Sequence, residues 1–166
     1  MIGANDTTKG RVIIDSGVSH PVRVYGRADQ QTTLILTSTE IATAIHSQIS
    51  GSVVSQTSGI YYIPCNTFYP QTRNVFFNLG GQRYGVPIED MAWKKSDYLE
   101  GMCISGVQVS DSGYIQRADS QGGVPHFTVL GDLFIKNHYI ALAYSDDKLG
   151  KPKVGIGRRP DVGVVL

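Results

Sequence analysis

Short runs of β-branched and aromatic residues, each closed by a turn residue, recur along the whole chain and constrain its fold more than any other feature. Such residues favour pleated strands, and nineteen glycines can supply the turns between them. The pattern therefore predicts a mostly β protein, in which Gly80-Gly81 is the turn of a hairpin. The predicted strands are residues 11–14, 61–63, 75–79, 82–86, 104–109, 127–130, 139–144 and 154–157.

One convincing helix is predicted after residue 36. Thr37 and Glu40 have the spacing of a capping box, in which a hydroxyl and a carboxylate satisfy free backbone amides at the start of a helix. Its apolar face recurs every four residues, at Ile41, Ile45 and Ile49.

The length and charge of the chain limit the classes of protein to which it can belong. A chain of 166 residues with 41% hydrophobic residues fits one domain, or one lobe of a larger enzyme. The formal net charge of +1 gives no electrostatic argument for a nucleic acid or an anionic membrane as partner. The longest apolar run, residues 33–36, is too short to span a bilayer.

Cys65 and Cys103 have no Cys or His nearby at metal-ligand spacing, which argues against a zinc site. Composition alone leaves two readings open, a pair of buried thiols or a single disulfide. The four histidines also lack paired spacing, so we expect no metal or cofactor and place these side chains on surfaces or helix flanks: His20, His46, His126 and His138.

Two segments carry the chemical signal. The strand at residues 11–14 ends at Asp15-Ser16-Gly17, a triplet that alone is common at strand ends. Further on, the apolar pair Val129-Leu130 is followed by Gly131 and Asp132. Together the two segments resemble those of pepsin-like aspartic proteases. Each lobe of those enzymes places an Asp-Thr/Ser-Gly on a wide loop, and an apolar-apolar-Gly strand threads behind it.

The resemblance continues through residues 60–65, 74–87, 101–108 and 129–139, in order and at matching spacing. It identifies residues 1–166 as a single lobe, the C-terminal lobe, of a fungal-type member of the family (peptidase family A1). The fold that it implies is mostly β, of the double-psi β-barrel type with short helices. It also implies that Cys65 and Cys103 form the disulfide of that lobe.

The resemblance also implies the chemistry. Two carboxylates that share one proton activate a water against a peptide bond at acidic pH, with no metal and no cofactor. Polypeptide substrates and a secreted or vacuolar location follow. The implied roles are catalysis by Asp15, support of the catalytic loop by Ser16, Gly17, Leu130 and Gly131, and substrate binding by Thr32, Thr33 and Val129.

Two features depart from the family pattern. The second carboxylate is expected from an N-terminal lobe that these 166 residues lack. In addition, residues 18–31 form an insertion, because removing them joins Asp15-Ser16-Gly17 directly to Thr32-Thr33 and restores the motif. A retained intron and a genuine surface loop are both compatible with this insertion.

Two other functions compete with a protease lobe. Two copies of the chain could each contribute Asp15 across a two-fold axis, as retroviral proteases do. Alternatively, the chain is a catalytically inactive fragment that acts as a binding or structural module. Asp132 is predicted to cap a short helix rather than to act as a catalyst.

Overall fold

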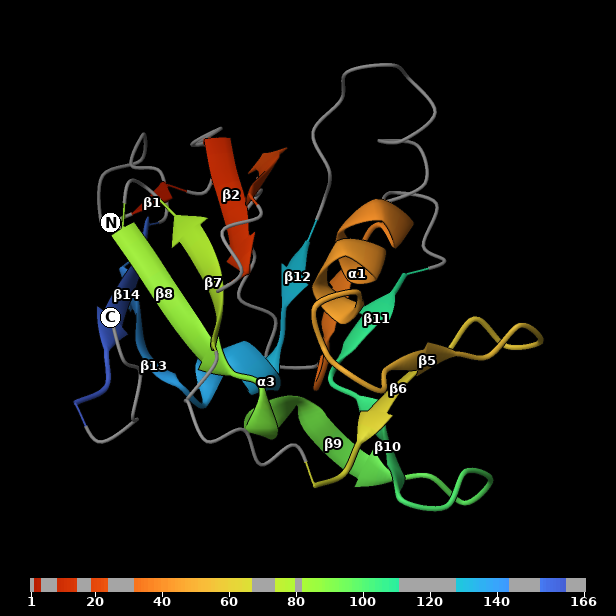
Figure 1. Ribbon diagram of the computed structural model, residues 1–166. Coiled ribbons are helices and arrows are strands. Elements are labelled where there is room, and N and C mark those ends of the chain that lie inside the picture. Colours follow the sequence, from red (N-terminus) through yellow and green to blue (C-terminus); the bar gives the residue numbers. More distant parts are fainter. Residues whose placement is uncertain are drawn as a thin grey trace.

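The computed structural model describes residues 2–3, 9–14, 19–23, 32–66, 74–79, 82–110, 128–143 and 153–160. Within these ranges, strands arranged in four sheets dominate, and the helices are short (Figure 1). The predicted mostly β fold is confirmed.

One sheet contains the strand that leads to Asp15. Its order is β3-β2-β7-β8, and each neighbouring pair is antiparallel. The strands span Ser19–Arg23 (β3), Lys9–Ile14 (β2), Asn74–Leu79 (β7) and Gln82–Pro87 (β8). The predicted hairpin is β7 and β8, and β3 lies within the predicted insertion, at the edge of the sheet.

A second sheet surrounds the segment that follows the insertion. Its central strand, β4, runs parallel to β11 and antiparallel to β12. The bounds are Ile35–Thr37 (β4), Val107–Val109 (β11) and Val129–Leu130 (β12). The single strand predicted at residues 104–109 is therefore two strands, β10 and β11, which meet at Gly106.

The described residues form two further sheets. One has the order β1-β14-β13, with strands at Ile2–Gly3 (β1), Lys153–Arg158 (β14) and His138–Ala143 (β13). The other has the order β5-β6-β10-β9, with strands at Val53–Val54 (β5), Tyr61–Pro64 (β6), Met102–Ser105 (β10) and Ala92–Lys95 (β9). The register between β9 and β10 shifts between Ile104 and Ser105, so Trp93 is the extra residue of a bulge.

The helices differ from the prediction at their starts. Helix α1 spans Thr39–His46, and its N-cap is Ser38, whose hydroxyl accepts a bond from the amide of Ile41. The predicted cap Thr37 is wrong, because Thr37 is the last residue of β4. Two shorter helical segments are η1 (Glu89–Met91) and α3 (Asp132–Ile135).

One apolar core joins the sheets. Phe134 of α3 contacts Phe77 of β7 edge to face, with ring centroids 5.6 Å apart. Figure 1 shows α3 between the β2-β7-β8 sheet and β12. The buried cluster consists of Ile35, Ile41, Ile45, Ile49, Ile63, Val75, Phe77, Leu79, Tyr84, Val86, Ile88, Met91, Val107, Leu130, Leu133 and Phe134. No helix in the described part of the chain has the length and apolarity needed to cross a membrane.

Candidate active site

The strand before the predicted catalytic residue ends beside the core. Asp15, Ser16 and Gly17 themselves lie outside the described residues, in the stretch between β2 and β3. Ile14, the last residue of β2, pairs with Val75, which is fully buried in the cluster that also contains Leu130. The chain therefore leaves the sheet toward Asp15 next to the core that supports the second half of the predicted site.

That second half is a close approach of two backbone segments. A Cβ atom added to Gly131 would overlap the carbonyl oxygens of Thr32 and Leu34. Backbone atoms cannot move aside as a flexible side chain can, so the position requires a glycine for lack of space. One of these segments contains Gly131, which is predicted to support the catalytic loop. The other contains Thr32 and Thr33, which are predicted to bind substrate.

Backbone hydrogen bonds fix the approach. The amide of Asp132 donates to the carbonyl of Thr32 at 2.8 Å, and the amide of Leu133 donates to the carbonyl of Thr33 at 2.9 Å. These donors belong to the first turn of α3, whose free amides need acceptors. The predicted site residues Thr32, Thr33 and Gly131 are thus brought together, and their roles stay predictions.

The strands beside this contact are held by a buried pair of hydroxyls. Val129 pairs with Leu36 and Leu130 with Ile35, so Thr128 continues the ladder toward Thr37. The two threonine hydroxyls are 2.8 Å apart, and both side chains are buried. Since β4 begins just after the predicted substrate-binding threonines and β12 ends just before Gly131, this bond helps set the register of both segments.

Asp132 does not have the role that the sequence suggested. The N-cap of α3 is Gly131, no side chain caps this helix, and Asp132 is exposed as the first helical residue. The prediction of Asp132 as the cap is therefore wrong. Among the described residues, no cluster of three or more His, Cys, Asp or Glu side chains could hold a metal ion.

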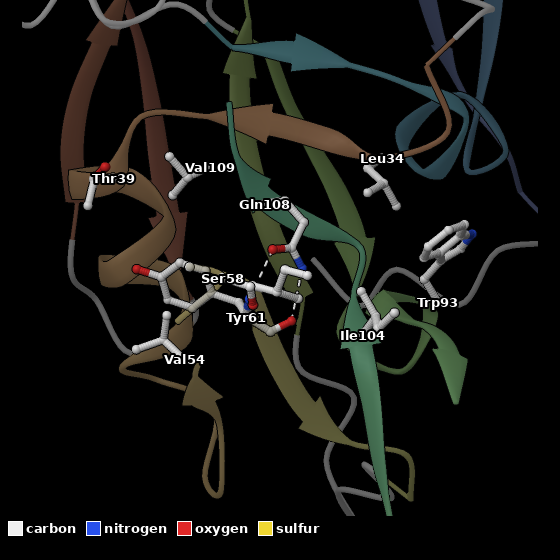
Figure 2. Close-up of a pocket in the computed structure, with 11 residues that line it drawn as sticks. Leu34, Thr39, Val54, Ser58, Tyr61, Trp93, Ile104, Gln108 and Val109 are labelled. Carbon is white, nitrogen blue, oxygen red and sulfur yellow. Dashed lines mark hydrogen bonds between the residues drawn. The ribbon is translucent and has the colours of Figure 1, made fainter. Parts of the chain in front are cut away.

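A pocket of about 460 Å³ opens beside β4 (Figure 2). Leu34, which directly follows the threonines of the candidate site, lies on its lining with Trp93 and Ile104. In Figure 2 these apolar side chains gather on one side of Gln108, with Tyr61 and Val54 on the other. The full lining is Leu34, Thr39, Val54, Ser58, Gly59, Ile60, Tyr61, Trp93, Ile104, Gln108 and Val109.

The pocket wall contains one buried amide side chain, that of Gln108. Gln108 accepts a bond from the Tyr61 amide at 3.0 Å, and its side-chain amide donates to the carbonyls of Tyr61 and Ser105 at 2.9 and 2.7 Å. Gln108 was not predicted to be a site residue. A single amide side chain between Val107 and Val109 was the available signal, because a buried polar residue in an apolar strand needs partners.

His46 lies behind the pocket wall, and the prediction that it sits on a surface or helix flank is wrong. His46 is only 3% exposed, its Nε2 lies 2.8 Å from the Ser105 hydroxyl, and its ring stacks on Tyr61 at 4.3 Å. Burial lowers the pKa of His46 to about 4, against the opposing effect of its bond to the Ala42 carbonyl. His138 is likewise buried, and desolvation lowers its pKa too.

The two cysteines form a disulfide, with an S–S distance of 2.07 Å. The bond links Cys65, which directly follows β6, to Cys103 of β10. These two strands are also paired with each other, with Cys103 opposite Ile63. The disulfide implied by the family resemblance is confirmed, and it ties together the sheet that carries the pocket wall.

Comparisons with known proteins identify a matching family and several similar proteins. A sequence model of the family described as eukaryotic aspartyl protease matches residues 6–154. The chain is similar to penicillopepsin-3 of Penicillium janthinellum, with 27% identity over 137 residues and 82% of this chain. It is 28% identical over 149 residues, or 90% of this chain, to aspartic protease pepA of Arthroderma otae. Aspergillopepsin-1 of Aspergillus fumigatus is 28% identical over 82% of this chain.

These matches cover only part of each relative. The chain spans 31% of penicillopepsin-3, 34% of the Arthroderma otae protease and 31% of the Aspergillus fumigatus protein. The chain thus spans about a third of the length of each of these relatives.

Proposed function

Because the chain belongs to the eukaryotic aspartyl protease family, we propose that it provides one lobe, the C-terminal lobe, of an aspartic endopeptidase and that Asp15 is one of its two catalytic carboxylates. The observation that carries the proposal is the contact of Gly131 and α3 with Thr32 and Thr33. It joins residues far apart in the sequence into one support, to which the proposal assigns the loop that carries Asp15.

The chemistry follows from the pairing of carboxylates. Two carboxyl groups held about 3 Å apart cannot both ionise cheaply, so they share one proton. The charged member accepts a proton from a water that attacks the scissile carbonyl carbon, while the protonated member donates to the developing oxyanion. Asp15 supplies one of these groups, and Ser16 and Gly17 support the loop that holds it.

The substrate is a polypeptide. Thr32 and Thr33 follow the motif once the insertion is passed over, and Thr33 is exposed where an extended peptide can reach it. The pocket that begins at Leu34 offers an apolar surface to one substrate side chain. We therefore expect cleavage next to apolar residues, with Val129 beside Leu36 completing the binding surface.

The second carboxylate comes from another lobe. The coverage of about a third of each relative supports this proposal, because it leaves ample sequence for such a lobe in those proteins. Secretion, or transfer to a vacuolar lumen, fits the Cys65–Cys103 disulfide, since such bonds persist in oxidising compartments.

The direct test replaces Asp15. The chain is combined with the portion of penicillopepsin-3 that it does not match, called here the complementing portion, and acid proteolysis is measured with and without pepstatin. We expect pepstatin-sensitive turnover that falls at least about a thousandfold in Asp15→Asn, because an amide cannot accept the proton of the attacking water.

A matched control is Asp97→Asn, which makes the same chemical change at an exposed aspartate in the turn after β9. Its activity should equal that of the unmodified chain. If Asp15→Asn and Asp97→Asn were equally active, Asp15 would not be catalytic.

A further inference from the structure

His46 belongs to a closed polar network behind the pocket. We call the four residues His46, Ser105, Gln108 and Tyr61 the His46 network. The Nε2 atom of His46 is hydrogen-bonded to the Ser105 hydroxyl. The Gln108 side chain donates to the Ser105 carbonyl. The same side chain accepts a bond from the Tyr61 amide and donates one to the Tyr61 carbonyl. The ring of Tyr61 stacks back on the imidazole, with an interplanar angle of 24°. Two of these residues, Tyr61 and Gln108, line the pocket.

The bonds of His46 define its neutral tautomer. Nδ1 lies 2.7 Å from the Ala42 carbonyl, which can only accept, so Nδ1 carries the hydrogen. Nε2 is then an acceptor, and the Ser105 hydroxyl donates to it. The Ser105 oxygen in turn accepts from the amide of Val107 at 3.2 Å. In this state every hydrogen of the pair has an acceptor.

Protonation reverses one of these bonds. A protonated imidazole donates from both nitrogens, so the Ser105 oxygen would accept from Nε2 as well as from the Val107 amide. The hydroxyl hydrogen of Ser105 would then need another acceptor, although Ser105 is completely buried. The same burial makes Ser105 unreachable for a substrate, which excludes this Ser–His pair as a nucleophile.

The surroundings provide no described counter-charge. The groups that contact the ring are the Ala42 carbonyl from α1, the Ser105 hydroxyl from β10 and the Tyr61 ring from β6. The one ionisable group among these is the Tyr61 phenol, whose oxygen is hydrogen-bonded to the Thr43 hydroxyl. The carbonyl end of α1 and the Ala42 bond favour a positive charge, but desolvation outweighs the Ala42 bond and lowers the pKa of His46 to about 4.

The network also reaches the far side of the pocket. Ser105 pairs with Ala92 of β9, and the next residue along β9 is Trp93, the bulged residue on the pocket lining. Trp93 is the single tryptophan of the chain and is 45% exposed. Trp93 is therefore a natural fluorescent probe that lies one strand pair away from Ser105.

We propose that His46 is a pH-sensitive positioning residue: its neutral form holds Tyr61 and Ser105 in place behind the pocket, and its protonation releases the pocket wall. The use of the pocket by a substrate rests on the proposed function, whereas the coupling of His46 to the pocket does not. For a protease that acts in acid, this coupling sets an acid limit below which the pocket loses its shape.

The sign of the pH dependence is fixed by the lowered pKa. Above pH 6.5 the imidazole is neutral in the folded and the unfolded chain, and its contribution to stability is fully present. As the pH falls from 6.5 toward 4, the unfolded chain takes up the proton and the folded chain does not, so stability is lost. Relative to a variant without this group, the unfolding constant should rise about 150-fold at pH 4 and approach about 300-fold below it.

The experiment uses the full chain without substrate. Acrylamide quenching of Trp93 is measured from pH 7.5 to 3.5 for the unmodified chain, for His46→Gln and for the matched control His138→Gln. His138 is also buried with a lowered pKa, but it stacks on Phe134 rather than on the pocket wall. We expect quenching to increase below pH 5 in the unmodified chain and in His138→Gln, and to stay flat in His46→Gln.

A second measurement covers the case in which His46→Gln does not fold. The imidazole signals of His46 in the unmodified chain are followed by NMR over the same pH range, and their midpoint should coincide with that of Trp93. A Trp93 signal that does not change, that changes equally in His46→Gln, or that changes at a pH where His46 does not titrate would overturn the proposal. None of these results depends on proteolytic activity. A failure of this proposal is therefore distinguishable from a failure of the proposed function.

Discussion

Among single residues, Gly131 is fixed by space rather than by backbone conformation. Its φ of −84° is open to any residue, yet the carbonyl oxygens of Thr32 and Leu34 occupy the volume of a side chain. Gly106 differs, because the atoms that a Cβ would meet there are the terminal methyls of Leu133. A flexible side chain can rotate away, whereas a hydrogen-bonded backbone cannot.

We therefore predict an order of stabilities for three substitutions. Gly131→Ala should lower the free energy of unfolding by at least about 2 kcal/mol, Gly106→Ala by about 1 kcal/mol, and Gly157→Ala by less than about 0.5 kcal/mol. The last is the control, since a Cβ at Gly157 meets only ordinary contacts at 3.5 Å. Urea titrations decide the order, and equal values for Gly131→Ala and Gly157→Ala would refute the tight approach.

The sequence indicated the glycine at this approach but misplaced the buried histidines. An apolar pair followed by glycine at a strand end is a local pattern, so Gly131 could be found from its neighbours. The hydrogen-bond partner of His46 is Ser105, which is 59 positions away. Local periodicity in the sequence cannot predict a contact between residues so far apart. A polar residue adjacent to Ile45 on the helix was therefore assigned to a surface or a helix flank, although its hydrogen bonds are satisfied inside.

At the scale of elements, the strands of the β7–β8 hairpin were predicted, whereas the short strands β4, β5 and β9 were not. The β7–β8 hairpin was found because its residues are almost all buried. The edge strands β5 and β9 were missed because β5 has only two residues and β9 ends in two lysines, so neither forms a long run of strand-favouring residues. Helix α1 starts two residues later than predicted, because Thr37 is used by β4 before Ser38 caps the helix.

The insertion at residues 18–31 is best tested as an element. Strand β3 lies within it and pairs only with β2, at the edge of a sheet whose other strands pair among themselves. We predict that a variant joining Gly17 to Thr32 changes the free energy of unfolding by less than about 1 kcal/mol and, with the complementing portion, has higher proteolytic activity, because Thr32 then follows the motif directly.

A control variant replaces residues 18–31 with a Gly/Ser segment of the same length, which separates the effect of length from that of sequence. If the shortened chain failed to fold while the control folded, the length of this segment would be part of the lobe. If both failed to fold, its sequence would be needed.

At the scale of the whole molecule, all four sheets contribute to one core. Ile63 of β6, Val75 of β7 and Ile35 of β4 belong to the same buried cluster, and Ile140 and Ile156 of the β13–β14 pair pack against it. A single core is what a lobe that folds as one unit requires. The candidate site lies where this core meets the backbone of Thr32 and Gly131, the residues that the proposal assigns to one half of a catalytic centre.

The central claim is that this half needs a second lobe. The most direct test measures pepstatin-sensitive proteolysis at acidic pH while the complementing portion is titrated onto a fixed amount of the chain. We predict no turnover by the chain alone at any concentration, and turnover that rises and saturates at one complementing portion per chain. Turnover by the chain alone that grows with the square of its concentration would contradict the claim and indicate a homodimer. No turnover at saturation would instead indicate an inactive binding module.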